Sequence, residues 1–268
     1  MSALQDVDVV VPARAERARD LAGLTWVLSR KNFQIRYKRA VLGVVWAVLQ
    51  PAFQAAVLTV VFVEFFDASR GVEHYPLYVL SGLLPWAFFA QSMSAGTTSV
   101  VDNGPLVKKV ALPLLVFPLS AIGGTALAFA AALPVLLVAA LVTGTVGWAL
   151  LLLPVAVLLQ VLVAVGVVTL TSSLYPAFRD VRYLVESLLV VGLYLSPVVY
   201  DPALAGDTVQ GLLRLNPLTG VLSLYRAAFL DRPVDLAAVG LSLLVALLVL
   251  ALGLAVFRRR SDEFPDLV

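Results

Sequence analysis

The longest interval without a formal charge in this 268-residue chain runs from Val110 to Phe178 and spans 69 residues. An ionisable side chain at the centre of a bilayer costs roughly 2.5 to 3.5 kcal/mol on insertion scales, and about 20 apolar residues cross the hydrocarbon as one helix. A run of this length therefore folds back on itself. The turn-like residues 143–147 divide it into two spans, Leu115 to Val142 and Trp148 to Tyr175. The sequence predicts an all-α integral membrane protein.

Four further apolar intervals complete a prediction of six transmembrane helices: Ala40 to Val63, Tyr75 to Val101, Tyr183 to Tyr200 and Leu236 to Phe257. The fifth of the six spans contains one acid, Glu186, four residues after Arg182, which predicts a local ion pair. Of the 19 Lys and Arg residues, 15 lie in the segments on one side of the spans. The positive-inside rule then places both termini in the cytoplasm, with the chain in the cytoplasmic (inner or plasma) membrane. The predicted units are a cytoplasmic N-terminal segment (1–39), a transmembrane domain (40–258) and a cytoplasmic tail (259–268).

Two segments outside these spans are also expected to be helical. Residues 21–39 carry two apolar faces, one with Leu21, Leu24, Leu28 and Ile35 and an opposite one with aromatic residues, so this helix lies on the membrane surface, is wedged between membrane and protein, or both. Between the fifth and sixth spans, Val209–Arg214 and Leu218–Phe229 are too short, at 1.5 Å per residue, to cross about 30 Å of hydrocarbon. We expect them to form re-entrant helices that enter from the outer side and return, against protein or a water-filled cavity.

The residues that several function classes require are missing. The chain has no cysteine and one histidine, His74, which excludes metal sites built from Cys or His clusters. It has no Gly-Lys pair, so it lacks the phosphate-binding loop of ATPases. A net charge of +2 gives no indication of nucleic-acid binding. We therefore expect no cofactor, no metal and no catalytic residues, and any ATP-driven role requires a partner.

Two blocks of the sequence resemble a known family. Residues 36–51 (RYKRAVLGVVWAVLQP) and 102–109 (DNGPLVKK) are similar to the permease subunit of type-2 ABC exporters for polysaccharides, the Wzm-type transporters of O-antigen, capsule, teichoic acid or galactan. Shorter matches lie at 81–86, 178–183, 194–200 and 216–218, and the resemblance covers about residues 20 to 258. One departure is Leu112-Pro113, where the family usually has an aromatic residue before the proline.

The resemblance implies a transport subunit that is not itself an enzyme. It would form the conduit of an ATP-driven exporter for a lipid-linked polysaccharide, as a homodimer in the membrane lipids that rests on two copies of an ABC ATPase subunit. Residues 98–109 would be the coupling helix that contacts the ATPase, through Asn103, Leu106, Val107, Lys108 and Lys109. Taken alone, the two lysines equally fit the positive-inside rule. The helix before the first span would be an interface helix, with Trp26, Arg30, Phe33, Arg36 and Tyr37.

Aromatic side chains are the candidate conduit wall, because sugar rings present apolar C–H faces that stack on flat side chains. Trp86, Phe88 and Phe89 lie roughly 16 to 21 Å into the second span at 1.5 Å per residue, which is too deep for interfacial anchors. Tyr194 and Tyr200 are similar candidates near the end of the fifth span. For each of these residues, packing between helices is the alternative.

Two other functions stay open from sequence. An ABC permease for drugs or other small hydrophobic molecules would share the six spans and the coupling scheme, and neighbouring genes would distinguish it. An integral-membrane transferase acting on lipid-linked sugars fits less well, because the spans contain one acid and no histidine for catalysis.

Overall fold

The computed structural model describes residues 14–38, 40–66, 72–109 and 112–268, with residues 14–20 and 66 described by their backbone alone. Within these ranges the chain is helical and contains no β-strand. Residues 1–13 and 39 of the predicted N-terminal segment lie outside the described residues.

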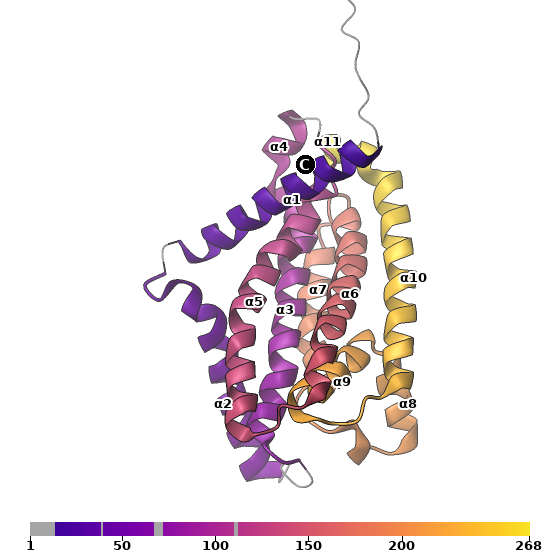
Figure 1. Cartoon of the computed structure of the whole chain (residues 1–268). Coiled ribbons are helices and arrows are strands. Elements are labelled where there is room, and N and C mark those ends of the chain that lie inside the picture. Colours follow the sequence, from indigo (N-terminus) through magenta and orange to yellow (C-terminus); the bar gives the residue numbers. More distant parts are fainter. Residues whose placement is uncertain (1–13, 39, 67–71, 110–111) are drawn as a thin grey trace, which may run out of the picture.

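Six helices run along the length of the molecule and form its bundle (Figure 1). They are α2 (Trp46–Phe66), α3 (Tyr75–Asp102), α5 (Val116–Thr143), α6 (Leu153–Leu174), α7 (Val181–Leu195) and α10 (Leu236–Arg260). At one end, which we name the α4 end, α1 (Arg14–Tyr37) crosses the bundle beside α4 (Gly104–Lys109) and α11 (Phe264–Leu267). At the opposite end, named the α9 end, lie α8 (Asp207–Leu215) and α9 (Pro217–Leu230). Short 3-10 turns are η1 (Gly43–Val45), η2 (Trp148–Leu152), η3 (Pro202–Leu204) and η4 (Ser261–Glu263).

Four of the described helical segments are long and apolar enough to cross a membrane: Gly43–Phe65, Val116–Thr143, Trp148–Leu174 and Leu236–Leu267. The sharp turn predicted at residues 143–147 is present, and Gly144 ends α5 in the left-handed conformation with φ 71°. The second predicted span corresponds to α3, which begins at Tyr75 and extends one residue beyond Val101.

The fifth predicted span, Tyr183 to Tyr200, is wrong at its end, because α7 stops at Leu195 after 15 residues. Ser196 is extended, with φ −99° and ψ 141°, as expected for a residue that precedes a proline. Residues 196–201 therefore form a non-helical stretch at the α9 end, which we name the 196–201 connection. The predicted pair of Arg182 and Glu186 is confirmed, with Nε 2.9 Å from Oε1.

The predicted leucine face of α1 is covered by protein over only part of its length. Leu21, Leu24 and Leu28 pack on an apolar cluster at the α4 end that includes Phe117 and Phe257, whereas Ile35 on the same predicted face is exposed. The helix lies on α5, where two glycines let it approach closely: Ser29 sits against Gly123 and Asn32 against Gly124. The helix therefore has a protein neighbour along one side.

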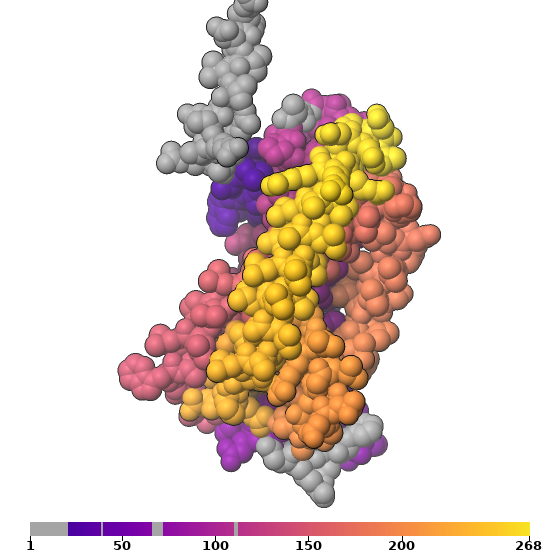
Figure 2. All heavy atoms as spheres, turned by 90° about the vertical axis from the view of Figure 1, so that its right-hand side faces the viewer, coloured from indigo at the N-terminus to yellow at the C-terminus, as the bar shows by residue number. Residues whose placement is uncertain are grey.

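Small residues set the packing of α10, which lies along the surface of the molecule in Figure 2. A Cβ atom at Gly253 would stand 2.8 Å from the backbone oxygen of Gly166, so α6 and α10 touch backbone to backbone. Such close approach through small residues is typical of helix pairs in membranes, where dispersion contacts replace the hydrophobic effect as the driving force. The larger core lies where α3, α5, α6 and α9 meet, around Tyr78, Tyr225 and Phe229.

Candidate functional site

The predicted coupling segment 98–109 divides at Asn103. Residues before it form the last turns of α3, and the Asn103 side chain donates to the Ser99 backbone oxygen over 2.8 Å, which closes that helix. Gly104-Pro105 then starts α4, a separate helix of six residues, because proline suits the first turn of a helix and not its interior. The resemblance implied one coupling helix over residues 98–109, but the structure divides this segment between the end of α3 and the separate helix α4.

The side chains of α4 point in two directions. Lys108 and Lys109, in its last turn, are exposed, whereas Val107 is buried and Leu106 half-buried in the apolar cluster at the α4 end. Val107 therefore fixes α4 to its own chain, and the expectation that it contacts a partner needs correction. The C-terminal segment supports α4 from the other side, where α11 packs on α4 and Phe264 contacts the ring of Phe257 at 5.3 Å.

The predicted interface residues lie on α1 with unequal burial. Trp26 (55% exposed), Arg30 and Arg36 are exposed, while Phe33 and Tyr37 are half-buried with ring centroids 5.3 Å apart. Arg36 donates to Oε1 of Gln91 on α3 over 2.5 Å. It also lines two cavities of about 340 and 320 Å³ at the α4 end, so this arginine stands beside the interior of the bundle.

The predicted wall aromatics fall into two groups. Trp86 (7% exposed) and Phe88 are buried within the chain, Trp86 with its ring against Gly192 of α7 and Phe88 against Phe129. Phe89 and Tyr200 are half-buried and Tyr194 is 58% exposed. The Tyr200 hydroxyl donates to the Tyr194 backbone oxygen over 3.1 Å, which keeps these two residues together. The structure therefore brings Tyr194 and Tyr200 together with exposed surface, whereas Trp86 and Phe88 are buried.

A buried arginine at the α9 end is the main feature that sequence reasoning missed. Arg226 projects from α9 and is only 6% exposed. Its Nη2 donates to the backbone oxygens of Pro197 and Val198, and its guanidinium lies 3.8 Å from the centroid of the Tyr78 ring. A sequence signal existed, because Arg226 is the only residue with a formal charge in the apolar segment 218–229.

Side chains from α3 and from the residue before α9 also hold the 196–201 connection in place. From α3, Tyr75 donates to the Val199 backbone oxygen over 2.5 Å and Tyr78 donates to that of Tyr200 over 2.8 Å. Asn216, which precedes α9, donates to the Ser196 hydroxyl over 2.8 Å. In each of these bonds the acceptor atom belongs to the connection. The backbone carbonyls of Val199 and Tyr200 are therefore satisfied by side chains, because no helix continues there to satisfy them.

A second polar contact ties α9 to the centre of the bundle. The Gln160 amide on α6 donates to the backbone oxygen of Pro85 in α3 over 2.8 Å and accepts from the Tyr225 hydroxyl. All three groups are buried, so each hydrogen bond avoids the cost of an unpaired polar atom. Polar bonds of this kind hold α9 against α3 and α6 and fix its position at the α9 end.

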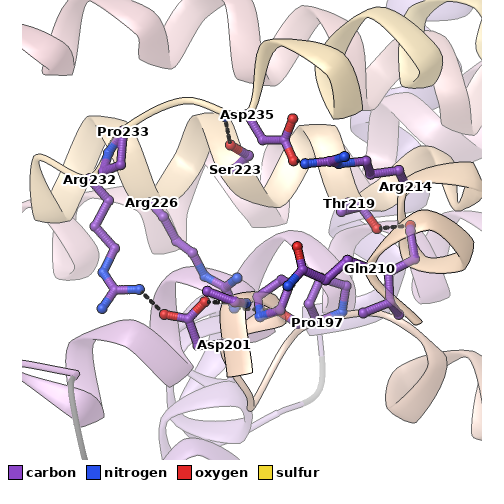
Figure 3. A pocket seen from close by; sticks show the side chains of 13 residues that line it. Pro197, Asp201, Gln210, Arg214, Thr219, Ser223, Arg226, Arg232, Pro233 and Asp235 are labelled. Carbon is purple, nitrogen blue, oxygen red and sulfur yellow. Dashed lines mark hydrogen bonds and ion pairs between the residues drawn. The ribbon is translucent and has the colours of Figure 1, made fainter. Parts of the chain in front are cut away.

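Beside Arg226 lies a cavity of about 490 Å³, which we name the arginine cavity (Figure 3). Residues from the 196–201 connection, η3, α8, α9 and the segment before α10 line it. Two ion pairs stand in its wall, Arg214 with Asp235 at 2.9 Å and Arg232 with Asp201 at 2.5 Å.

Both carboxyl groups of the arginine cavity are held in the charged form. Burial disfavours the Asp201 carboxylate, but the backbone N–H of Ala203 and the guanidinium of Arg232 outweigh it, so the pKa of Asp201 lies below its ordinary value. The pKa of Asp235 is lowered in the same way, because the Ala238 backbone N–H and Arg214 outweigh the effect of burial. Asp201 and Asp235 are therefore both negatively charged at neutral pH.

Comparisons with known proteins agree along nearly the whole chain. A family described as ABC-2 type transporter matches residues 23–230. The O-antigen export system permease protein RfbA of Myxococcus xanthus is 27% identical over 248 residues, covering 91% of this chain and 95% of the relative. Two proteins of the same name from Klebsiella pneumoniae are each 25% identical and cover 92% of this chain and 96% of their own length.

Proposed function

Since the chain belongs to the ABC-2 type transporter family, we propose that it is the permease subunit of an ATP-driven exporter that carries a lipid-linked polysaccharide across the cytoplasmic membrane. The observation that carries this proposal is the match to three O-antigen export permeases over nine tenths of both chains. The described residues also contain no group of three His, Cys, Asp or Glu side chains that would hold a metal ion.

The six long helices are the six spans in this proposal, with the α4 end in the cytoplasm. Supporting it, the exposed lysines of α4 and the three arginines that end α10 lie at the same end of the bundle as α1 (Figure 1). The pair α8 and α9 enters from the outer side and returns. α9 is buried against α3, α6 and α10, which meets the requirement that non-spanning backbone at membrane depth is covered by protein. α8 packs on α9 and α10 and keeps most of its residues exposed.

Two copies pair in the membrane and each rests on a separate ABC ATPase subunit. Coupling runs through α4, because Lys108 and Lys109 present two cations on a short helix whose base, Val107, is fixed in the chain. Side chains of α1, which include Arg30 and Trp26, form a second interface with the ATPase subunit beside α4. Phe89, Tyr194 and Tyr200 remain available for the conduit wall, since each keeps exposed surface in the single chain.

Charge reversal on α4 tests this function. Lys108→Glu with Lys109→Glu should leave membrane insertion intact, because the other cytoplasmic cations still orient the chain. Binding of the cognate ATPase subunit should weaken by about tenfold or more, as expected when cations that face an acidic partner surface are reversed. Stimulated ATP turnover and surface glycan, detected by labelling intact cells, should fall with it.

The matched control is Arg258→Glu with Arg259→Glu, which makes the same charge change on exposed residues at the end of α10. Normal ATPase binding and export with both lysines reversed would return Lys108 and Lys109 to the role of topology signals. Normal surface glycan in cells that lack this gene would refute the export function itself.

A further inference from the structure

Positive groups outnumber negative ones among the described residues that line the arginine cavity. Its wall contains three guanidinium groups, those of Arg214, Arg226 and Arg232, against the two carboxylates of Asp201 and Asp235. Each carboxylate already accepts from one arginine and from one backbone N–H, so its capacity for a third arginine is limited. Arg226 forms no ion pair with any carboxylate of the described residues.

Arg226 is also incompletely hydrogen-bonded. Nη2 reaches the Pro197 and Val198 carbonyls, but Nε is buried and has no partner among the described residues. Carbonyl oxygens and the Tyr78 ring stabilise a cation without neutralising it. A buried guanidinium with an unused donor and no carboxylate at ion-pair distance among the described residues is costly, and an anionic ligand that pairs with it recovers part of that cost.

The remaining donors suit an oxyanion. The structure gives Arg214 one hydrogen bond, through Nε to Asp235, so its terminal nitrogens keep donors for a ligand, and its side chain is 42% exposed. In Figure 3 the side chains of Arg226 and Arg232 descend side by side from α9 and the segment after it, and Arg214 lies across the cavity from them. Planar guanidinium groups around one space match the tetrahedral oxygens of a phosphate, which they bind through paired N–H groups.

We propose that the arginine cavity binds a phosphate-type oxyanion carried on a larger molecule. A free phosphate would fill only a small part of about 490 Å³, a volume in the range of sites for drug-sized ligands. Two sources share this chemistry at the outer surface of the cytoplasmic membrane. One is the headgroup of an anionic phospholipid, and the other is a phosphate group on the exported lipid-linked polymer. The second source rests on the proposed function, whereas the first does not.

Binding to the purified chain tests the site without any need for transport. The chain is held in uncharged maltoside micelles, and its unfolding temperature is measured as inorganic phosphate replaces chloride at constant ionic strength. The site predicts a saturable rise in unfolding temperature, since a ligand that binds the folded state stabilises it. Arg226 itself is left intact, because it holds the 196–201 connection.

Two variants at the cavity make the test specific. Gln210→Glu supplies a negative charge inside the cavity with little change of shape, and Arg214→Gln removes a donor at its rim; each should weaken the apparent phosphate affinity about tenfold. Arg259→Gln, an exposed arginine at the far end of α10, should respond like the parent. No saturable shift, or the same shift in all four proteins, would overturn the proposal.

Two further ligands identify the source. Short-chain phosphatidylglycerol that competes with phosphate assigns the site to a lipid headgroup, and pyrophosphate that competes where the lipid does not assigns it to a phosphate on the exported molecule. If neither competes, the arginine cavity does not take a phosphate from either source and the proposal fails. Because no ATPase partner is present, a failure here leaves the export function untouched, and a failure of export leaves the binding result valid.

Discussion

Replacing single aromatic residues distinguishes a conduit wall from packing between helices. Tyr194, at the end of α7, is 58% exposed and its backbone oxygen accepts from Tyr200, a bond that an alanine would keep. Trp86 is 7% exposed and its ring fills the space above Gly192. Tyr194→Ala should therefore change transport and Trp86→Ala should change folding.

The two changes differ strongly in expected magnitude. Truncating a buried aromatic costs about 3 to 5 kcal/mol, which lowers the ratio of folded to unfolded protein by a factor of about 150 or more. An exposed substitution changes stability by about 0.5 kcal/mol at most. Loss of one sugar stacking contact costs on the order of 0.5 to 1.5 kcal/mol, so export per folded Tyr194→Ala molecule should fall by about 2- to 13-fold.

Both quantities are measured on one culture, folded protein from the size-exclusion profile and export from surface glycan labelling. Leu188→Ala is the matched control, because Leu188 is on the same helix with 59% exposure but offers no flat ring. Equal export per folded molecule for Tyr194→Ala and Leu188→Ala would show that Tyr194 does not stack on the polymer. Export by Trp86→Ala that falls further than its folded amount would show that Trp86 leaves its packed position during transport.

Two further predictions concern stability. Gly253→Ala should destabilise the protein by about 1 to 3 kcal/mol, because its Cβ would meet the backbone of Gly166 at 2.8 Å, whereas Gly240→Ala on the same helix has open space and should be neutral or stabilising by up to about 1 kcal/mol; thermal unfolding of both variants decides this. Asp201→Asn should lower the unfolding temperature at pH 7, since the lowered pKa of Asp201 beside Arg232 gives stability that is present above about pH 4 and lost as pH falls through that lowered pKa. The difference from the parent should shrink as the pH falls below about 4 and vanish once the pH is below the lowered pKa of Asp201, and a difference that stays constant through this range would refute the linkage.

The spans could be predicted from sequence because their signal is local. A charge is excluded from the hydrocarbon wherever it occurs, so charge-free intervals gave α3 to within one residue and located the turn at Gly144. The end of α7 was also readable, since Pro197 stands in the sequence and its effect on Ser196 is a backbone rule. The predicted fifth span followed composition and not this rule, and it is therefore too long.

The polar cluster at the α9 end could not be predicted, because it is made by contacts between distant parts of the chain. Tyr78 and Tyr200 are 122 positions apart, and the carbonyls that receive Arg226 become available only because α7 has ended. Orientation on a short helix is equally non-local. Nothing in the residues around Val107 indicates that its side chain faces the apolar cluster at the α4 end and not the solvent.

The helix α3 joins α4 to the 196–201 connection. α3 has 28 residues, about 42 Å at 1.5 Å per residue, and its last turn is tied to the start of α4 through Asn103. Its first turns hold the 196–201 connection through Tyr75 and Tyr78. A displacement of α4 by a partner therefore reaches the wall of the arginine cavity along continuous backbone, with one weak point at Pro85, where the helix lacks a backbone N–H. Gln160 on α6 donates to the Pro85 carbonyl at that point, so α6 supports α3 where the backbone hydrogen bonding of α3 is interrupted.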